Sequence, residues 1–269
     1  MEKLLEKKTA IITGAANGVG QIISQKFAEE GANLILADMD EKNLIKEAEL
    51  IRKNGTHVEI FCGDLRKNLT IKNLLALSAK SFDKVDILVN ASRQVSISHP
   101  LTADDLFFEE MMDQNVAVNL NLSRAVAKKM ISQNMNRTDS GEIIGSIVNL
   151  SSIASHRALP DTLSYSVSSA ALDQLTKSMA ISLAPSGVRV NAVSIGSVMS
   201  SSLRTKLASN KVNLEDLISA TPLGRLGDAS EAAEAVLFLA SNKSSFITGT
   251  ILTVDGGRSL LDRMADAAY

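Results

Sequence analysis

Short apolar runs rich in β-branched residues alternate along the chain with longer segments in which apolar residues recur at helical spacing. The runs predict strands, and enough residues separate them for crossover helices. They occupy residues 8–13, 33–37, 57–62, 86–90, 145–151, 188–194 and 249–257. Seven apolar strands with helices between them predict a doubly wound α/β fold, with a parallel sheet covered by helices on both faces.

Two intervening segments show the helical pattern most clearly, residues 19–31 and 41–55. Each closes on a glycine, and Gly31 is expected to be the C-cap of the first helix. No internal repeat, low-complexity tract or proline- and glycine-rich linker interrupts the alternation. We therefore expect a single domain over residues 1–269.

Composition restricts the partners and the compartment. The chain has 28 Lys and Arg against 30 Asp and Glu, a net charge of −2, so no basic field favours nucleic acid or an anionic membrane. The N-terminal apolar run is too short for a signal peptide or a membrane span. We expect a cytoplasmic protein with neither nucleic-acid nor membrane partners.

Cysteine and histidine indicate no disulfide and no metal site. The single cysteine, Cys62, suits a reducing compartment, and its surroundings "HVEIFCGD" predict a buried strand. We therefore expect an inert core thiol rather than a nucleophile. The three histidines, His57, His99 and His156, are scattered without metal-ligand spacing.

The first strand runs directly into a glycine-rich loop, "TGAANGVG", and a helix follows at once. Its three glycines, Gly14, Gly18 and Gly20, suit a sharp turn and close backbone approach to a pyrophosphate at the helix N-terminus. Such a pattern is weak alone, because tight turns and helix packing use glycine as freely. Asp38 strengthens it, ending the second strand eighteen residues beyond Gly20.

The Asp38 carboxylate is placed to accept both hydroxyls of an adenosine ribose and to repel a 2′-phosphate. No Lys or Arg stands at positions 15, 16 or 39 to neutralise such a phosphate. The pattern therefore predicts NAD rather than NADP. The alternative is a plain turn followed by a solvated aspartate.

Several further segments occur in the order typical of the short-chain dehydrogenase/reductase family. They are "GDL" (63–65), "VNAS" (89–92), "NLSS" (149–152), "VRVNAVSIGS" (188–197), "PLGRLGDASEAAEAVLFLAS" (222–241) and "SFITGTILTVDGG" (245–257). Over nearly its whole length the chain resembles the classical, single-domain type, which implies a Rossmann fold. The resemblance implies cofactor contacts at Gly14, Asn17, Gly18, Val19, Gly20, Asp38, Met39, Asp64, Leu65, Asn90, Tyr165, Ile195, Gly196 and Val198.

The resemblance also implies catalytic residues. Tyr165 would be the acid/base, and Ser152, thirteen positions earlier, would orient the substrate oxygen. Asn115 and Asn119 compete for the family's helical asparagine. The local match favours Asn119, but the distances to "SRAV" and to Asn90 favour Asn115, which we choose.

The chain departs from the family pattern at three places. Ser169 stands where the family has the lysine of Tyr-x3-Lys, Val89 and Ser92 replace the outer residues of Asn-Asn-Ala-Gly, and Ile195 replaces the usual Pro-Gly before Gly196. The last two change loop shape near the nicotinamide. Only the first bears directly on the chemistry.

A tyrosine has an ordinary pKa of about 10, and the family lysine lowers it. A cation about 5 Å away, at an effective dielectric near 20, contributes roughly 3 kcal/mol, or about two pKa units. Ser169 supplies no charge, and Lys177 lies three turns along the helix. We therefore expect Tyr165 to work without a cation, in a slow or alkaline-shifted dehydrogenase that performs better as a reductase.

The sequence is compatible with three functions. The first is an NAD-dependent oxidoreductase acting on an alcohol or ketone substrate. The second is a cofactor-binding protein without catalysis, which Ser169 favours. The third is a non-redox lyase or dehalogenase on the same fold, which the intact glycine loop and Asp38 oppose.

Other segments bear on substrate and assembly. His156 and Arg157 suit either an anionic substrate or a solvated loop. Residues 199–224 resemble a substrate lid, with an ordinary surface helical pair as the alternative. The family resemblance implies a homotetramer or homodimer.

Overall fold

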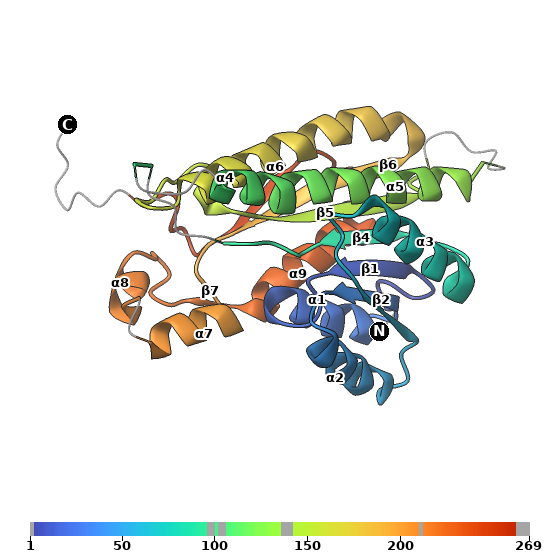
Figure 1. The fold of residues 1–269 in the computed structure, drawn as a ribbon, viewed down its shortest axis with the longest axis horizontal. Coiled ribbons are helices and arrows are strands. Elements are labelled where there is room, and N and C mark those ends of the chain that lie inside the picture. Colours follow the sequence, from blue (N-terminus) through green and yellow to red (C-terminus); the bar gives the residue numbers. More distant parts are fainter. Residues whose placement is uncertain (1–2, 96–99, 102–105, 136–141, 210–211, 262–269) are drawn as a thin grey trace.

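The computed structural model describes residues 3–95, 100–101, 106–135, 142–209 and 212–261 (Figure 1). A seven-stranded sheet runs through the middle, in the order β3-β2-β1-β4-β5-β6-β9, and every pairing in it is parallel. Its strands are β1 (Thr9–Thr13), β2 (Asn33–Asp38), β3 (Val58–Cys62), β4 (Ile87–Asn90), β5 (Gly145–Ser152), β6 (Val188–Ile195) and β9 (Ile251–Val254). The predicted fold class and all seven predicted strands are confirmed.

Helices cover both faces of this sheet (Figure 1). One face packs against α1 (Gly18–Glu29), α2 (Glu41–Arg52) and α9 (Ala229–Ala240), and the other against α3 (Asn68–Phe82), α5 (Val118–Ser132) and α6 (Leu163–Leu183). Strand residues alternate between the two layers, as Ile11 and Ile12 show, because successive side chains point to opposite faces. Burial on both faces explains why the inner strands β1, β2, β4, β5 and β6 read as largely apolar runs.

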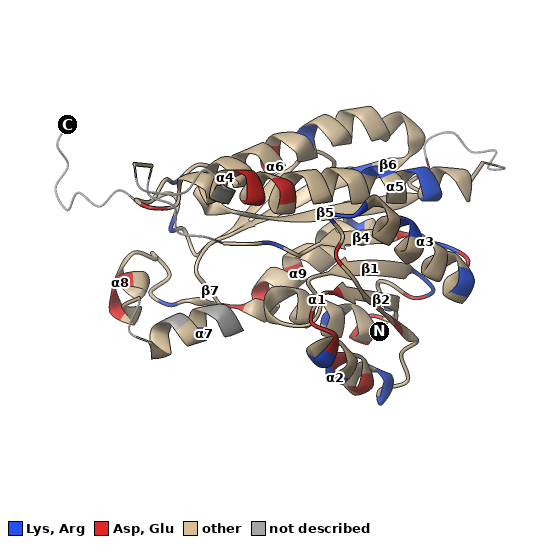
Figure 2. Cartoon of the chain, in the orientation of Figure 1, with Lys and Arg blue, Asp and Glu red and all other residues tan. Residues whose placement is uncertain are grey.

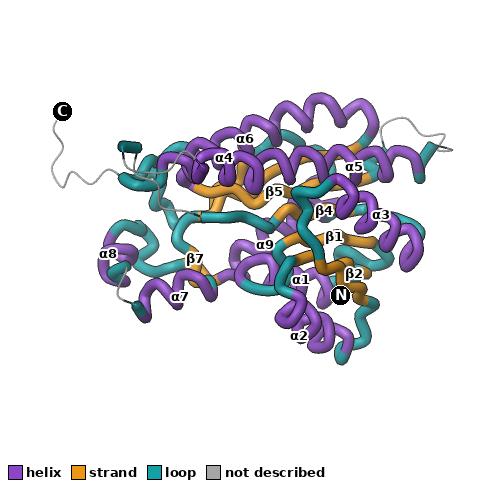
Figure 3. Tube along the Cα trace, viewed as in Figure 1, coloured by secondary structure: helices purple, strands orange, loops and turns teal. Residues whose placement is uncertain are grey.

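Smaller elements complete the chain. They are α4 (Leu106–Met112), the π-helical turn η1 (Asp113–Ala117), the 3-10 turns η2 (Ile153–Ser155), η3 (Ala184–Ser186) and η4 (Asn242–Ser244), α7 (Ser201–Ala208), α8 (Leu214–Ser219) and the short pair β7 (Val198–Met199) and β8 (Gly227–Asp228). Helices α7 and α8 lie apart from the sheet layers (Figure 3). The loop that follows β4 leaves the sheet toward the same side of the molecule.

The C-cap of α1 is Glu30, one residue before the glycine expected there. Gly31 follows with a φ of +85°, so it provides the left-handed turn directly after the cap.

The prediction for Cys62 is wrong in one respect. This cysteine ends β3, which is an edge strand of the sheet, and its side chain is exposed rather than in the core. Partial desolvation and the carboxylates of Glu41, Asp38 and Asp40 raise the pKa of the thiol. A raised thiol pKa disfavours the thiolate, so a nucleophilic role remains unsupported.

The positions of acidic and basic residues are interspersed along the outer helices of the ribbon (Figure 2). Within the described residues, no helix combines the length and the apolar character needed to cross a membrane.

Candidate active site

A cavity of about 520 Å³ opens at the carboxyl ends of the neighbouring strands β1 and β4, where the order of the strands along the sheet reverses. In open α/β sheets this topological switch point is the usual ligand site. Most predicted cofactor residues line the cavity: Gly14, Asn17, Gly18, Val19, Gly20, Asp38, Tyr165, Ile195, Gly196 and Val198. It also contains Ser152, so the glycine loop and the predicted catalytic hydroxyls share one cavity.

The glycine loop folds tightly against the end of β4. Gly14 has a φ of +65°, and a Cβ there would lie 2.8 Å from the backbone nitrogen of Ser92. A Cβ on Gly20 would overlap the carbonyl oxygen of Gly14. Asn17, the N-cap of α1, makes no side-chain capping bond. The loop therefore presents an uncapped helix N-terminus at the cavity, which is an arrangement that favours anions.

Backbone N–H groups fix the carboxylate of Asp38 beside this loop. Oδ2 accepts from Ala16 N at 3.0 Å, and Oδ1 accepts from Met39 N at 2.7 Å and from Asp40 N at 3.1 Å. An ionised carboxylate has about four acceptor positions, so one remains for a ligand hydroxyl.

A second cavity, of about 260 Å³, adjoins Asp38 and includes the predicted residues Met39, Asp64 and Leu65. Asp64 has a partner that sequence reasoning did not anticipate. Arg66 donates to both of its oxygens, at 2.9 and 2.8 Å, and this hydrogen bonding holds the pKa of Asp64 below its usual range. A contact of Asp64 with a ligand remains a prediction.

Asn90 lies beneath the site and does not line either cavity. Its buried Nδ2 donates to Ser123 Oγ at 2.9 Å and to Asn149 Oδ1 at 2.8 Å. The side chain therefore joins the end of β4 to β5 and α5. A direct cofactor contact by Asn90 remains a prediction. The observed hydrogen bonds show that Asn90 holds the end of β4 against its neighbours.

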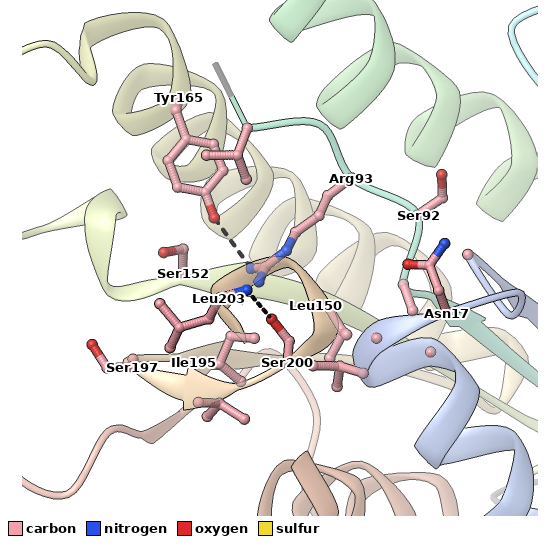
Figure 4. A pocket seen from close by; sticks show the side chains of 18 of the residues that line it. Asn17, Ser92, Arg93, Leu150, Ser152, Tyr165, Ile195, Ser197, Ser200 and Leu203 are labelled. Atoms are coloured by element: carbon pink, nitrogen blue, oxygen red, sulfur yellow. Dashed lines mark hydrogen bonds between the residues drawn. The ribbon is translucent and has the colours of Figure 1, made fainter. Parts of the chain in front are cut away.

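Ser152 ends β5 and Tyr165 lies in the first turn of α6, and both line the wall of the 520 Å³ cavity (Figure 4). Both residues are buried. Ser152 Oγ accepts a bond from Ala154 N at 3.2 Å, which orients the hydroxyl at the start of η2.

Asn115 lies in the π-helical turn between α4 and α5 and is buried. Its Oδ1 accepts from Gln94 N at 2.9 Å, and its Nδ2 donates to Gln94 O at 3.0 Å and to Ser168 Oγ at 3.2 Å. Asn119, the competing candidate, donates to the backbone oxygen of Asn115 at 2.7 Å. Both asparagines thus belong to one network, in which Asn115 ties the loop after β4 to α6.

The hydroxyl of Ser169 turns back onto its own helix and donates to the carbonyl oxygen of Tyr165 at 2.7 Å. The expectation that Tyr165 has no neighbouring cation is wrong. Arg93 Nη1 donates to Tyr165 Oη at 3.1 Å from the loop after β4 (Figure 4). The sequence signal was present, since Arg93 directly follows "VNAS", but nothing local indicates where so long a side chain points.

A larger cavity, of about 1000 Å³, shares Ser152 and Tyr165 with the first. Leu203 of α7 and Leu217 of α8 help to line it, so part of the predicted lid lies against this space; its movement remains a prediction. Arg157 and Arg258 are also in its wall, whereas His156 is not. Arg258 donates to Ser197 Oγ.

Among the residues described, no cluster of three or more His, Cys, Asp and Glu side chains is suited to a metal ion. His99 lies outside the described residues.

Comparisons with known proteins identify the family of the chain. A family model described as enoyl-(acyl carrier protein) reductase matches residues 14–259. The chain is 36% identical over 262 residues to the uncharacterized oxidoreductase YxbG of Bacillus subtilis (strain 168), covering 94% of this chain and 91% of that protein.

Solved structures superpose over almost the full length. A short-chain type dehydrogenase/reductase from Mycobacterium marinum has a TM-score of 0.86 at 30% identity, covering 96% of this chain and 97% of that one. A 7α-hydroxysteroid dehydrogenase complexed with NADH and 7-oxo glycochenodeoxycholic acid has a TM-score of 0.86 at 28% identity, covering 95% and 96%. The chain belongs to the classical short-chain dehydrogenase/reductase family of oxidoreductases.

Proposed function

We propose that the chain is an NAD-dependent oxidoreductase that interconverts a hydroxyl and a carbonyl group on a small-molecule substrate. One observation carries the proposal: the glycine loop and Asp38 share a single cavity with the hydroxyls of Ser152 and Tyr165. The observed residues fit a nicotinamide dinucleotide, because an uncapped helix N-terminus suits the pyrophosphate and the remaining acceptor position of the Asp38 carboxylate suits a ribose hydroxyl.

The charges around Asp38 support NAD over NADP. Arg93 is the only Lys or Arg among the described residues lining the two cavities that adjoin Asp38, and it is bonded to Tyr165. A 2′-phosphate would therefore meet a carboxylate without a partner cation. The related hydroxysteroid dehydrogenase, whose structure contains NADH, is consistent with this preference.

When bound, the nicotinamide supplies or accepts the hydride. Ser152 then donates a hydrogen bond to the substrate oxygen and holds it beside Tyr165. In reduction the phenol of Tyr165 gives its proton to the carbonyl oxygen and becomes tyrosinate. In oxidation the tyrosinate takes the proton of the substrate hydroxyl.

The lining of the larger cavity supports a substrate with a broad apolar surface and an anionic group. Leucines and alanines make up much of its wall, and Arg157 and Arg258 are its only Lys or Arg among the described residues. No Asp or Glu lines it within that part of the chain. A carboxylate or phosphate on the substrate could therefore be bound by the guanidinium of Arg157.

The same proposal includes a cytoplasmic homodimer or homotetramer. Large apolar side chains are exposed on neighbouring helices, Phe107 and Phe108 on α4 and Leu163, Val167 and Ile181 on α6. An apolar surface of this kind is typical of protein interfaces. Light scattering of the purified protein tests the assembly.

The first experiment is a titration with NADH and NADPH, followed by nicotinamide fluorescence. The chain contains no tryptophan, so protein emission interferes little. We expect micromolar binding of NADH and much weaker binding of NADPH. Binding of neither would favour the non-redox alternative, while tight NADH binding without turnover of any alcohol or ketone would favour a non-catalytic one.

A further inference from the structure

We propose that Arg93 is a catalytic residue, whose guanidinium stabilises the ionised form of Tyr165. The chemistry rests on the proposed function, since it takes Tyr165 to be the acid/base. Arg93 Nη1 donates to Tyr165 Oη at 3.1 Å and lies 3.4 Å from the backbone oxygen of Ser151 (Figure 4). A positive donor bonded to a hydroxyl oxygen favours that hydroxyl's charged form.

The charge of Arg93 is not neutralised by a carboxylate in the part of the chain that the structure describes. Its two hydrogen-bond acceptors are a hydroxyl and a carbonyl oxygen, and both are uncharged. The charged side chains lining the cavities that reach Tyr165 are Arg93, Arg157, Arg258 and, at the cofactor end, Asp38. A tyrosinate would thus be the nearest counter-charge for this guanidinium.

The backbone on either side of Arg93 is held by buried side chains. Thr13 Oγ1 accepts from Ser92 N at 3.1 Å, and Asn115 makes two bonds to the backbone of Gln94, at 2.9 and 3.0 Å. The direction in which the arginine leaves the loop is therefore fixed. Asn115 acts here as a positioning residue for Arg93.

Ser169 leaves room for this contact. Its short side chain is bonded back to the helix, and only about 10 Å³ of space remains among Arg93, Tyr165, Ser169 and Asn115. That volume holds roughly one water molecule and no second long side chain. A cation at position 169 and the guanidinium of Arg93 are therefore alternative solutions for the same space.

The proposal revises the chemistry expected from the sequence. In oxidation, Tyr165 Oη must accept the proton of the substrate hydroxyl, and the guanidinium of Arg93 lies against the oxygen that acts as the base. In reduction, the proton leaves Tyr165 for the substrate oxygen, and Arg93 stabilises the negative charge that remains. Neither direction is left without a cation.

The composition of the chain allows a direct test that needs neither cofactor nor substrate. Tyr165 and Tyr269 are the only tyrosines, and there is no tryptophan. In a Y269F background, the near-ultraviolet absorbance of tyrosinate therefore reports Tyr165 alone. The pH midpoint of this absorbance is compared between Y269F and Y269F/R93Q, over the pH range in which circular dichroism shows both proteins folded.

We expect R93Q to move the midpoint to higher pH by about one to two units, because an opposite charge within hydrogen-bond reach produces shifts of that size. Y269F/R93K, which keeps a shorter cation, should lie between the two. Y269F/K177Q is the matched control. It removes an exposed cation from the same helix without touching Tyr165, and its midpoint should not move.

The double change R93Q/S169K in the Y269F background gives the rescue test. Because the two cations are alternatives, the lysine introduced by S169K should return the midpoint toward that of Y269F. An unchanged midpoint in Y269F/R93Q, with its melting temperature preserved, would overturn the proposal. If R93Q does not fold, an unchanged midpoint in R93K would overturn it as well. Failure of the proposed function would be seen separately, as an absence of NADH binding while the midpoint still shifts.

Discussion

The 520 Å³ cavity is built in different ways at its two ends. At the end proposed to bind the cofactor (the cofactor end), Gly14, Gly20 and Asp38 belong to one strand–helix–strand unit, and backbone groups set their geometry. At the end proposed to carry the chemistry (the catalytic end), Tyr165 and Ser152 meet Arg93, which lies 72 residues before the tyrosine and reaches it through a long side chain. The first end is local in sequence, whereas the second is assembled across the sheet.

This difference decides how each end tolerates change. Loop glycines pack against backbone that cannot move aside, so the cofactor end has few alternative sequences. At the catalytic end, a positive charge can come from any element whose side chain reaches Tyr165. Loss of a lysine at position 169 is therefore compatible with proton transfer by Tyr165.

The largest effect expected is on turnover and comes from Y165F. Removing the acid/base should lower kcat by about a hundred- to ten-thousand-fold in both directions, since proton transfer contributes that much. NADH affinity should change little, because the phosphate loop and Asp38 are untouched. Steady-state rates and fluorescence titration measure the two quantities on the same preparation.

Y269F is the control for this experiment, because it removes the other tyrosine. If Y165F lost as much NADH affinity as it lost kcat, the two ends of the cavity would not contribute separately to cofactor binding and to proton transfer, and the comparison drawn above would be wrong.

The placement of the glycine loop beside Asp38 was predictable because its signals are local. Glycine spacing, the strand before it and Asp38 after it all lie within the first 38 residues, and the structure brings them to one cavity. The inner strands β1, β2, β4, β5 and β6 were equally clear, because burial on both faces makes them largely apolar runs. Cys62 was misplaced because the same apolar pattern does not reveal which strand lies at the edge.

The catalytic end was only partly predictable. Ser152 and Tyr165 lie at a recognisable spacing, but a local pattern cannot indicate that Ser169 bonds to its own helix or that Arg93 approaches from another element. Arg66 was missed at Asp64 for a similar reason. Side-chain direction depends on tertiary packing, and that information is not in residue spacing.

The next largest effect is on cofactor affinity and comes from D38N. Losing the charge should weaken NADH binding about tenfold to a hundredfold, because hydrogen bonds to charged groups contribute about 1.5–3 kcal/mol. NADPH should bind as well as NADH or better, because the repulsion of its phosphate is removed. Fluorescence titration with both nucleotides gives the ratio.

E41Q is the matched control, since Glu41 is an exposed carboxylate near Asp38 that lines neither of the two cavities adjoining Asp38. Equal losses in the two variants would argue against a special role for Asp38.

A smaller effect concerns substrate charge. R157Q should raise KM for a ketone bearing a carboxylate by at most about fivefold, because an exposed ion pair contributes up to about 1 kcal/mol. KM for the corresponding amide should be unchanged, and so should NADH affinity. Pairs of acid and amide substrates test this, and equal effects on both members would remove the argument for an anionic group.

The smallest effect concerns stability and tests whether the two ends share one folding unit. Glu231 in the first turn of α9 accepts from Asp228 N and pairs with Arg225, and these bonds lower its pKa from 4.5 to about 2. Because the folded-state pKa is depressed, the stabilisation is complete above pH 4.5 and is lost as the pH falls through about 2. Glu231 is exposed, so E231Q should lower the free energy of unfolding by only about 0.5–1 kcal/mol at pH 7.

Urea unfolding at pH 7 and pH 3 measures this effect, with nucleotide release and circular dichroism as two separate signals. The two signals should give coincident unfolding transitions, and the difference in unfolding free energy between E231Q and the parent protein should be smaller at pH 3. Since α9 packs against α1 beneath the glycine loop and against β5, which ends at Ser152, separate transitions would mean that the two ends of the cavity also unfold separately.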